Sequence, residues 1–403
     1  MEVINASDWV RPDVDAAQKA RAVAASILAD VQARGEDAVR EHSLAIDGFE
    51  PRVLELEPWR NYPLTEETRK HMDLAAERIQ QFAEMQFSMY RDLEREDRYG
   101  RYGQRVVPLD RMAAYIPGGR FPLVSTALMT LIPARVAGVG ERVAVSPGDA
   151  PEIRAAASRA GATSFVHLGG AQAIAALAIG TGLQASVDMI VGPGNAYVNA
   201  AKALVQDRVQ IDTLAGPSEI LVLCDDSIDP EWVAFDVLAQ AEHDPMALSV
   251  LASTSDSVLT RVAQVIERES KACPEKDTGL IQLVLCSDVD QMVALSNRMA
   301  PEHLQLACKP GKVDPLRLRH YGSLFIGAHS AVALGDYCTG PNHTLPTMAC
   351  ARRKGGLQVG DFLKILTWQE IAPDHYGELA QTAIHLAGIE KLDFHRRSLE
   401  VRR

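Results

Sequence analysis

The sequence lacks the features of membrane, secreted and nucleic-acid-binding proteins. Its apolar stretch at residues 123–139 is too short and too polar to span a bilayer, because it contains Thr126, Thr130, Pro133 and Arg135. The first residues, MEVINASDWVRPD, hold no basic segment followed by an apolar one, so we expect no signal peptide. The formal net charge of −12 gives the chain no overall attraction for nucleic acid or anionic membranes.

Cysteine is scarce, and the six cysteines form no CxxC pair. Such scattered cysteines predict reduced thiols and a cytoplasmic protein. The chain does have length and apolar content. With 403 residues, 47% of them hydrophobic and 23% charged, it is expected to fold into two or three domains.

The central part of the chain alternates short β-rich runs with alanine-rich helical stretches. The runs are RVAVS at 142, SFVHL at 164, DMIVG at 188 and EILVL at 219. This alternation is typical of a parallel α/β sheet, which binds ligands beyond the carboxyl ends of its strands. A second α/β stretch follows over residues 219–330. We therefore predict an α/β protein with two Rossmann-like parallel-sheet domains and small helical N- and C-terminal extensions.

One glycine-rich turn follows a predicted strand. In VGPGNAYV, Gly192, Gly194 and Asn195 come directly after the run at 188. Glycines let a backbone approach a pyrophosphate, and a helix start offers free amides to it. The third glycine of GxGxxG is absent, so a tight strand-to-helix turn without a ligand explains the motif equally well.

Two further motifs place a histidine beside another polar residue. In LAQAEHDP, Gln240 and His243 lie one helical turn apart and could share a metal, although the local pattern alone favours an ordinary helix end. In PEHLQL, Glu302 precedes His303, a natural general base, and we expect a loop or helix start there because Pro301 comes first. A structural histidine and a solvated glutamate explain this motif equally well.

The last two motifs differ in strength. The segment ALGDYCTGPNHTLPT, at 333–347, contains Asp336 and His343 and is rich in glycine and proline, which favours a functional loop. The segment GIEKLDFH ends in Glu390 and His395, and its local pattern predicts only a charged terminal helix.

Taken together, these stretches resemble the histidinol dehydrogenase family along nearly the whole chain. Eight stretches occur in the order of the family: YIPGGRFPLVSTALM, GGAQAIAALAIGT, VGPGNAYV, IDTLAGPSEILV, LAQAEHDP, APEHLQL, GDYCTGPNHTLPT and the final E-x-x-x-x-H. Each stretch alone is weak evidence for the family, but eight stretches in the same order are specific evidence for it.

The resemblance implies an enzyme that oxidises an alcohol through an aldehyde to a carboxylate, with two NAD and one Zn²⁺. It implies that Glu302 and His303 are the acid/base pair. The implied zinc ligands are Gln240, His243, Asp336 and His395. The implied substrate contacts are these four residues with Ser218, His303, His343 and Glu390. The implied NAD contacts are Tyr115, Gln172 and Asn195.

The resemblance also implies how the chain is divided and how it assembles. Residues 1–25 are expected to form an N-terminal helical arm. Residues 26–103 and 219–350 are expected to form a first, discontinuous α/β domain, and residues 104–218 a second, NAD-binding one. Residues 357–403 are expected to form a helical arm that docks on the partner in a homodimer with shared active sites.

Two alternatives remain open at this stage. Relatives within the family oxidise other polar alcohols, such as a sulfopropanediol, and the stretches GGRFPL and GGLQVGDFLKILTWQ look closer to those relatives. The second alternative is a binding protein that kept the fold and lost catalysis. Against it, all six implied metal and catalytic residues are present.

Overall fold

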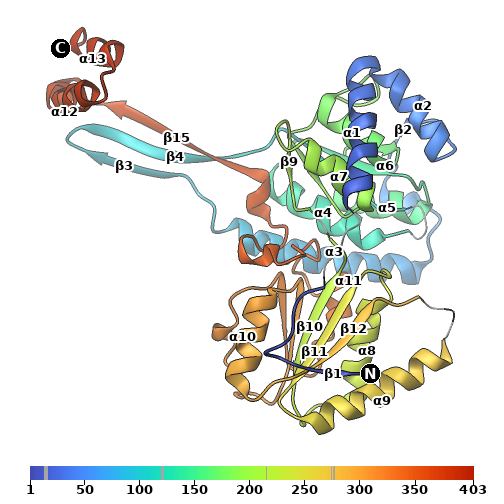
Figure 1. Ribbon diagram of the computed structural model, residues 1–403. Helices are drawn as coiled ribbons and strands as arrows, with labels where there is room; N and C mark the ends of the chain where they lie inside the picture. Colours follow the sequence, from blue (N-terminus) through green and yellow to red (C-terminus); the bar gives the residue numbers. More distant parts are fainter. Residues whose placement is uncertain (13–16, 119–121, 215, 274, 276) are drawn as a thin grey trace.

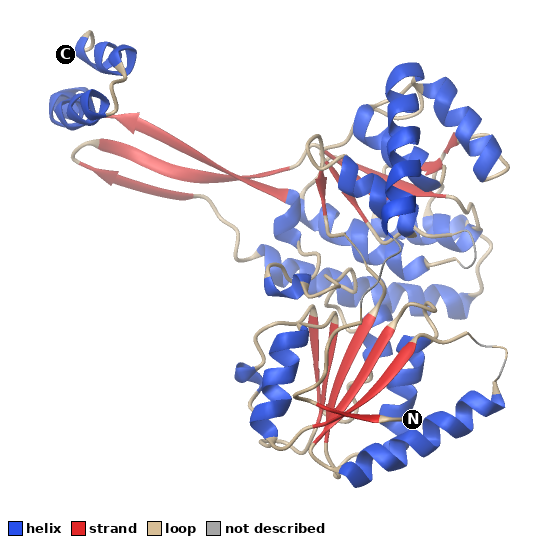
Figure 2. Cartoon of the chain, viewed as in Figure 1, coloured by secondary structure: helices blue, strands red, loops and turns tan. Residues whose placement is uncertain are grey.

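A computed structural model describes residues 1–12, 17–118, 122–214, 216–273, 275 and 277–403. It contains two α/β units, each built on a six-stranded sheet, and a long three-stranded arm that projects away from them (Figures 1 and 2). The predicted α/β class with two mainly parallel sheets is confirmed. Among the described residues, no helix has the length and apolar character needed to cross a membrane.

Unit 1 is the α/β unit that holds the glycine turn. Its sheet has the order β2 (Arg52–Leu54), β7 (Ser164–His167), β6 (Glu141–Ser146), β5 (Arg111–Tyr115), β8 (Met189–Val191) and β9 (Gln210–Ile211). All pairings are parallel except the one between β2 and β7. Its helices are α1 (Ala17–Arg34), α2 (Glu36–Ile46), α3 (Glu66–Phe87), α4 (Val124–Ala137), α5 (Pro151–Ala160), α6 (Gly170–Ile179) and α7 (Ala196–Leu204).

Unit 2 is the α/β unit that holds the candidate catalytic residues. Its sheet is wholly parallel, in the order β1 (Val3–Asn5), β12 (Leu280–Leu285), β11 (Leu248–Ser253), β10 (Glu219–Cys224), β13 (His303–Ala307) and β14 (Ser323–Ile326). Its helices are α8 (Pro230–Ala241), α9 (Asp256–Ala272), α10 (Val289–Met299) and α11 (Val332–Tyr337). All six residues of β10 are buried, as expected for a strand covered on both faces.

The arm consists of β3 (Leu93–Asp97), β4 (Gly100–Pro108) and β15 (Leu363–Ile371), paired antiparallel, with α12 (Tyr376–Ile389) and α13 (Asp393–Glu400) at its tip (Figure 1). Part of the extension after residue 357, predicted to be helical, is therefore a nine-residue strand. Its side chains are exposed or half-buried, because this ribbon is not covered by a second layer.

The observed division of the chain differs from the predicted one. Residues 26–103 were expected to join 219–350, but Ile27 and Val39 pack on one face of the unit 1 sheet, and Met72 and Ile79 on the other. Residues 1–25 were expected to form a helical arm, but the segment begins with β1, which pairs with β12 at the edge of unit 2, and the expected helix begins only at Ala17. Helical periodicity shows that a segment has an apolar face, and it does not show which sheet that face covers.

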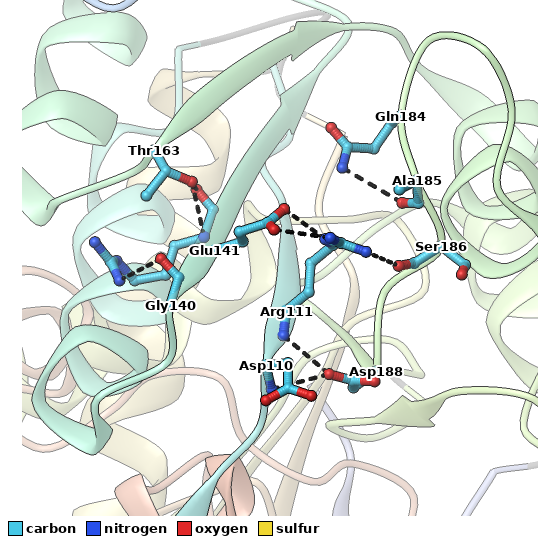
Figure 3. Close-up of polar contacts among 10 residues, drawn as sticks. Asp110, Arg111, Gly140, Glu141, Thr163, Gln184, Ala185, Ser186 and Asp188 are labelled. Carbon is cyan, nitrogen blue, oxygen red and sulfur yellow. Dashed lines mark hydrogen bonds and ion pairs between the residues drawn. The ribbon is translucent and has the colours of Figure 1, made fainter.

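A polar cluster closes the amino edge of the unit 1 sheet (Figure 3). Arg111, the first residue of β5, contacts the carboxylate of Glu141 on β6 at 2.7 Å and donates to the carbonyl oxygen of Ser186 at 2.8 Å. The Asp188 carboxylate accepts the backbone amides of Asp110 and Arg111 at 3.0 and 2.9 Å. These contacts join the starts of three strands, so the glycine turns lie at the opposite, carboxyl edge.

Candidate active site

The predicted catalytic residues, Glu302 and His303, lie at the amino end of β13 in unit 2, beside the amino end of β10. His303 is the first residue of β13, and it is paired in register with Ile220 of β10. Helices α8 and α11 end on the same side, and they carry Gln240 and Asp336. The site of unit 2 therefore lies at the amino ends of the strands. We expected it beyond their carboxyl ends, where such sheets bind ligands. The predicted loop is confirmed for Pro301 and Glu302, and β13 begins directly after them at His303.

Glu302 and His303 both bind the backbone of Glu219. The Glu302 carboxylate accepts the N–H of Glu219 at 2.8 Å, and Nδ1 of His303 lies 3.2 Å from the carbonyl oxygen of Glu219. Since a carbonyl only accepts, Nδ1 of His303 carries the proton and Nε2 is the basic nitrogen. That Nε2 atom is buried and makes no hydrogen bond. It lies 3.8 Å from a carboxylate oxygen of Asp336.

Burial sets the protonation of this pair. It lowers the pKa of His303 to about 4, and the hydrogen bond to Glu219 only partly opposes this shift. Burial also raises the pKa of Glu302 well above its usual value. At neutral pH the imidazole is therefore uncharged and able to accept a proton.

The loop after α11 brings His343 to the same place. Nδ1 of His343 lies 2.8 Å from the carbonyl oxygen of Asp336, which leaves Nε2 free to bind a ligand. Burial lowers the pKa of His343 to about 4. Burial raises the pKa of Asp336 to about 6, and the nearby His243 opposes this shift.

The remaining predicted residues of unit 2 lie at the end of α8 and directly before β10. Gln240 is buried in its last turn, and His243 is exposed just beyond its end. Nδ1 of His243 lies 2.8 Å from the carbonyl oxygen of Ala239, so its Nε2 is also available. Ser218 is half-buried directly before β10, and its carbonyl oxygen accepts the amide of Leu248.

Glu390 and His395 lie elsewhere. Both are exposed at the tip of the arm, at the end of α12 and in α13, far from α11 in the same chain (Figure 1). Within the described ranges, no group of three or more His, Cys, Asp and Glu side chains is arranged to hold a metal ion. One chain therefore brings together only part of the predicted zinc site.

The residues predicted to lie near NAD surround the carboxyl edge of unit 1. The hydroxyl of Tyr115, at the end of β5, accepts the amide of Gly170 at 3.2 Å, and burial raises the pKa of Tyr115 to about 12. The Gln172 amide donates to Asp47 at 2.9 Å, while its Oε1 atom is buried without a partner.

The glycine turn after β8 is the third element of this edge. Gly192 has a φ of 109°, and a Cβ atom there would lie 2.1 Å from the carbonyl oxygen of Tyr115. Only glycine fits that position. The side chain of Asn195 accepts the amides of Tyr197 and Val198, so these two amides at the start of α7 are not free, in contrast to the expectation.

Glu219, whose backbone binds both catalytic side chains, was not identified from the sequence. Glu219 is 1% exposed, and its carboxylate contacts Arg11 and accepts the amide of Met348 at 3.2 Å. Burial raises the pKa of Glu219, and Arg11 opposes this shift. A buried acidic residue at the start of an apolar strand, as in GPSEILV, is the signal that could have identified it.

A comparison with models of known protein families shows which family the chain belongs to. The model described as histidinol dehydrogenase matches residues 10–403. The chain belongs to the histidinol dehydrogenase family. The resemblance expected from the sequence is thereby confirmed. Since the family is one of oxidoreductases, the chain is an oxidoreductase.

Individual histidinol dehydrogenases are similar over most of the chain. The protein of that name from Thermus thermophilus is 41% identical, over 94% of this chain and 93% of its own. The one from Pseudomonas aeruginosa is 42% identical, over 93% and 89%. The crystal structure of histidinol dehydrogenase from Elizabethkingia anophelis has a TM-score of 0.91 and 29% identity, covering 99% of this chain and 96% of that one.

Proposed function

We propose that the chain oxidises L-histidinol through L-histidinal to L-histidine, with NAD as the oxidant and Zn²⁺ in the site. One observation carries the proposal within this family. Glu302 and His303 are buried side by side on the backbone of Glu219, with a basic Nε2 atom of His303 beside Asp336. Such a pair is equipped to remove one proton from an alcohol and another from water.

The donors in unit 2 fit a zinc ion. His243 has Nε2 available because Nδ1 is engaged by Ala239, and this second contact orients a metal-binding imidazole. Asp336 would supply a carboxylate oxygen and Gln240 an amide oxygen. When bound, zinc would orient the amine and imidazole of the substrate. His343 and Ser218 would contact the substrate beside it.

The carboxyl edge of unit 1 fits NAD, which would accept hydride from the substrate carbon. The support lies in the Gly192 turn, which has no room for a side chain, and in the unpaired Oε1 atom of Gln172. Tyr115 and Asn195 flank the same edge. The crossover from β9 to β10 joins this edge to the amino ends of β10 and β13. The proposed NAD site of unit 1 and the proposed zinc and substrate site of unit 2 are therefore adjacent along the chain.

The two catalytic side chains take different protons. His303 accepts the hydroxyl proton of the alcohol at Nε2, since the Nδ1 proton is held by the Glu219 carbonyl. Glu302, whose pKa is raised by burial, accepts a proton from the water that attacks the aldehyde. The burial of both groups excludes bulk water from the proton transfers.

The missing contacts are proposed to come from a second copy of the chain. The arm carries His395 and Glu390 away from their own unit 2 (Figure 1). Its tip exposes large apolar side chains, with Phe394 84% and Ile389 66% exposed, which favours docking on another surface. A homodimer in which each arm completes the partner's site would supply the fourth zinc ligand and a substrate-binding carboxylate.

A substrate panel tests this function. Purified zinc-loaded protein should reduce NAD with L-histidinol and not with a sulfopropanediol, and a chelator should abolish the reaction. NAD reduction with the sulfonated alcohol alone would favour the other branch of the family. Folded, zinc-loaded protein that binds histidinol but reduces no NAD with any alcohol would favour a binding protein without catalysis.

A further inference from the structure

A buried ion pair lies directly beneath the Gly192 turn. The side chains of Lys202, in α7, and Asp212, just after β9, are 0% and 2% exposed and contact each other. Nζ of Lys202 donates to the carbonyl oxygen of Gly192 at 2.9 Å. The Asp212 carboxylate accepts the N–H of Gly192 at 2.7 Å. Both backbone polar groups of Gly192 are therefore held by one charged pair.

Stability does not explain why charges occupy this position. Removing a lysine and an aspartate from water is costly, and apolar replacements of a buried pair are often as stable. The pair instead fixes a backbone conformation. Gly192 has a positive φ and lies against the Tyr115 carbonyl, and its two polar groups face inward to Lys202 and Asp212. The residues that follow Gly192 in the turn, Pro193 to Asn195, are half-buried or exposed.

The same aspartate is anchored to the base of the arm. The backbone carbonyl oxygen of Asp212 accepts a hydrogen bond from Nζ of Lys354 at 2.8 Å, and Lys354 also pairs with Asp361 at 2.9 Å. Asp212 begins the crossover that ends at Glu219, the residue that holds the catalytic pair. The turn is thus fixed relative to the segment that leads into unit 2.

We propose that Lys202 and Asp212 are positioning residues for NAD, and that their pair holds the Gly192 turn in its binding conformation before the cofactor arrives. The inference rests on the proposed function, because it assigns NAD to this edge. A turn that is already ordered spares NAD binding the cost of ordering it, so the pair raises affinity without touching the cofactor.

The direct test removes both charges together, in the variant K202M/D212N. The variant loses the ion pair without leaving a single charge buried. Asparagine also keeps an oxygen that can accept the Gly192 amide. In zinc-loaded enzyme we expect the Kd of NAD, measured by titration calorimetry, and its KM to rise by about tenfold or more. Zinc content, the Kd of histidinol and kcat at saturating NAD should change by less than about twofold.

A matched control is present in unit 2. Asp225 follows β10 at the end opposite Glu219, has a side chain that is 3% exposed, and pairs with Lys312 at 3.4 Å. The variant K312M/D225N removes the same residue types away from the turn, so its Kd of NAD should equal that of the wild type. An equal rise in both variants would overturn the assignment, as would a folded K202M/D212N protein that binds NAD normally.

Two readouts separate the possible failures. Absence of NAD binding to the wild-type enzyme would overturn the proposed function itself. If K202M/D212N does not fold, amide exchange in the wild type still decides. The Gly192 amide should be protected without NAD, and NAD should slow its exchange by less than about twofold. Exchange as fast as in an unfolded peptide until NAD binds would overturn the pre-ordered turn.

Discussion

The carbonyl oxygen of Glu219 binds Nδ1 of His303 at 3.2 Å and thereby selects the tautomer whose Nε2 atom is basic. The N–H of the same Glu219 residue binds the Glu302 carboxylate at 2.8 Å. The side chain of Glu219 contacts Arg11 of the N-terminal segment. We therefore expect the catalytic geometry in unit 2 to depend on Arg11, which lies 208 positions before Glu219 in the chain.

Arg11→Met tests this dependence. The substitution leaves the buried Glu219 carboxylate without its cation, so we expect kcat to fall by about tenfold and the free energy of unfolding by about 3 kcal/mol. Zinc content and the Kd of NAD should stay unchanged. Arg34→Met, which removes a pair on the surface of α1, is the control and should keep wild-type kcat. An Arg11→Met enzyme with normal kcat would show that Glu219 needs no anchor.

His243→Ala tests the zinc site. Loss of one of four protein ligands should release the metal, so zinc content, measured by atomic absorption, and activity should fall together. His329→Ala is the control, because His329 is exposed after β14 at the opposite end of the sheet from His303. Full zinc occupancy in His243→Ala would remove this residue from the ligand set.

The buried His303 predicts a pH dependence of stability in the metal-free protein. The pKa of His303 is about 4 in the folded chain and 6.5 for the free side chain. Between these values the unfolded chain binds a proton that the folded chain does not, so the stability contribution of His303 decreases as pH falls, by up to about 1.4 kcal/mol per pH unit.

His303→Asn lacks this titration. The difference in free energy of unfolding between wild type and variant, measured by urea denaturation, should therefore shift in favour of the variant between about pH 6 and about pH 5. A difference independent of pH would show that His303 titrates normally. The same variant should bind zinc and have greatly reduced kcat, because Nε2 serves the proton and not the metal.

Much of unit 1 and of the site could be predicted because the signals are local. Strands β6, β7, β8 and β10 are buried on both faces and read as short apolar runs between glycine turns. The motifs with Gln240, His303, Asp336 and His343 occur in this order along the chain. The structure brings these residues to one edge of unit 2.

The errors share a physical cause, which is that long-range packing leaves little local trace. Strand β13 begins at a polar residue, His303, and the residue before it is Glu302, whose carboxylate binds a backbone amide 83 positions away. Strand β15 belongs to an uncovered ribbon, so Leu363–Ile371 shows no buried face. The pair of Lys202 and Asp212 looks like two ordinary surface charges in sequence, because only the fold buries them. Residues 119–121 of GGRFPL lie outside the described residues.

The proposed exchange of arms predicts complementation between two inactive variants. His303→Asn and His395→Ala are mixed through a denaturation and refolding cycle. If each site uses the partner's arm, a mixed dimer has one site with both defects and one with neither, so activity should return to about a quarter of wild type. His385→Ala, on the exposed side of α12, is the control and should be active alone. Verified mixed dimers that stay inactive would show that each arm serves its own chain.

The most direct measurement of the proposed function is the ratio of NADH to histidine formed when L-histidinol is limiting. Because the same site is proposed to carry out both oxidations, with His303 acting on the alcohol and Glu302 on water, we predict about two NADH for each histidinol consumed, with histidine as the product. A ratio of about one with histidinal released, or no NADH at all from folded zinc-loaded protein, would contradict the account.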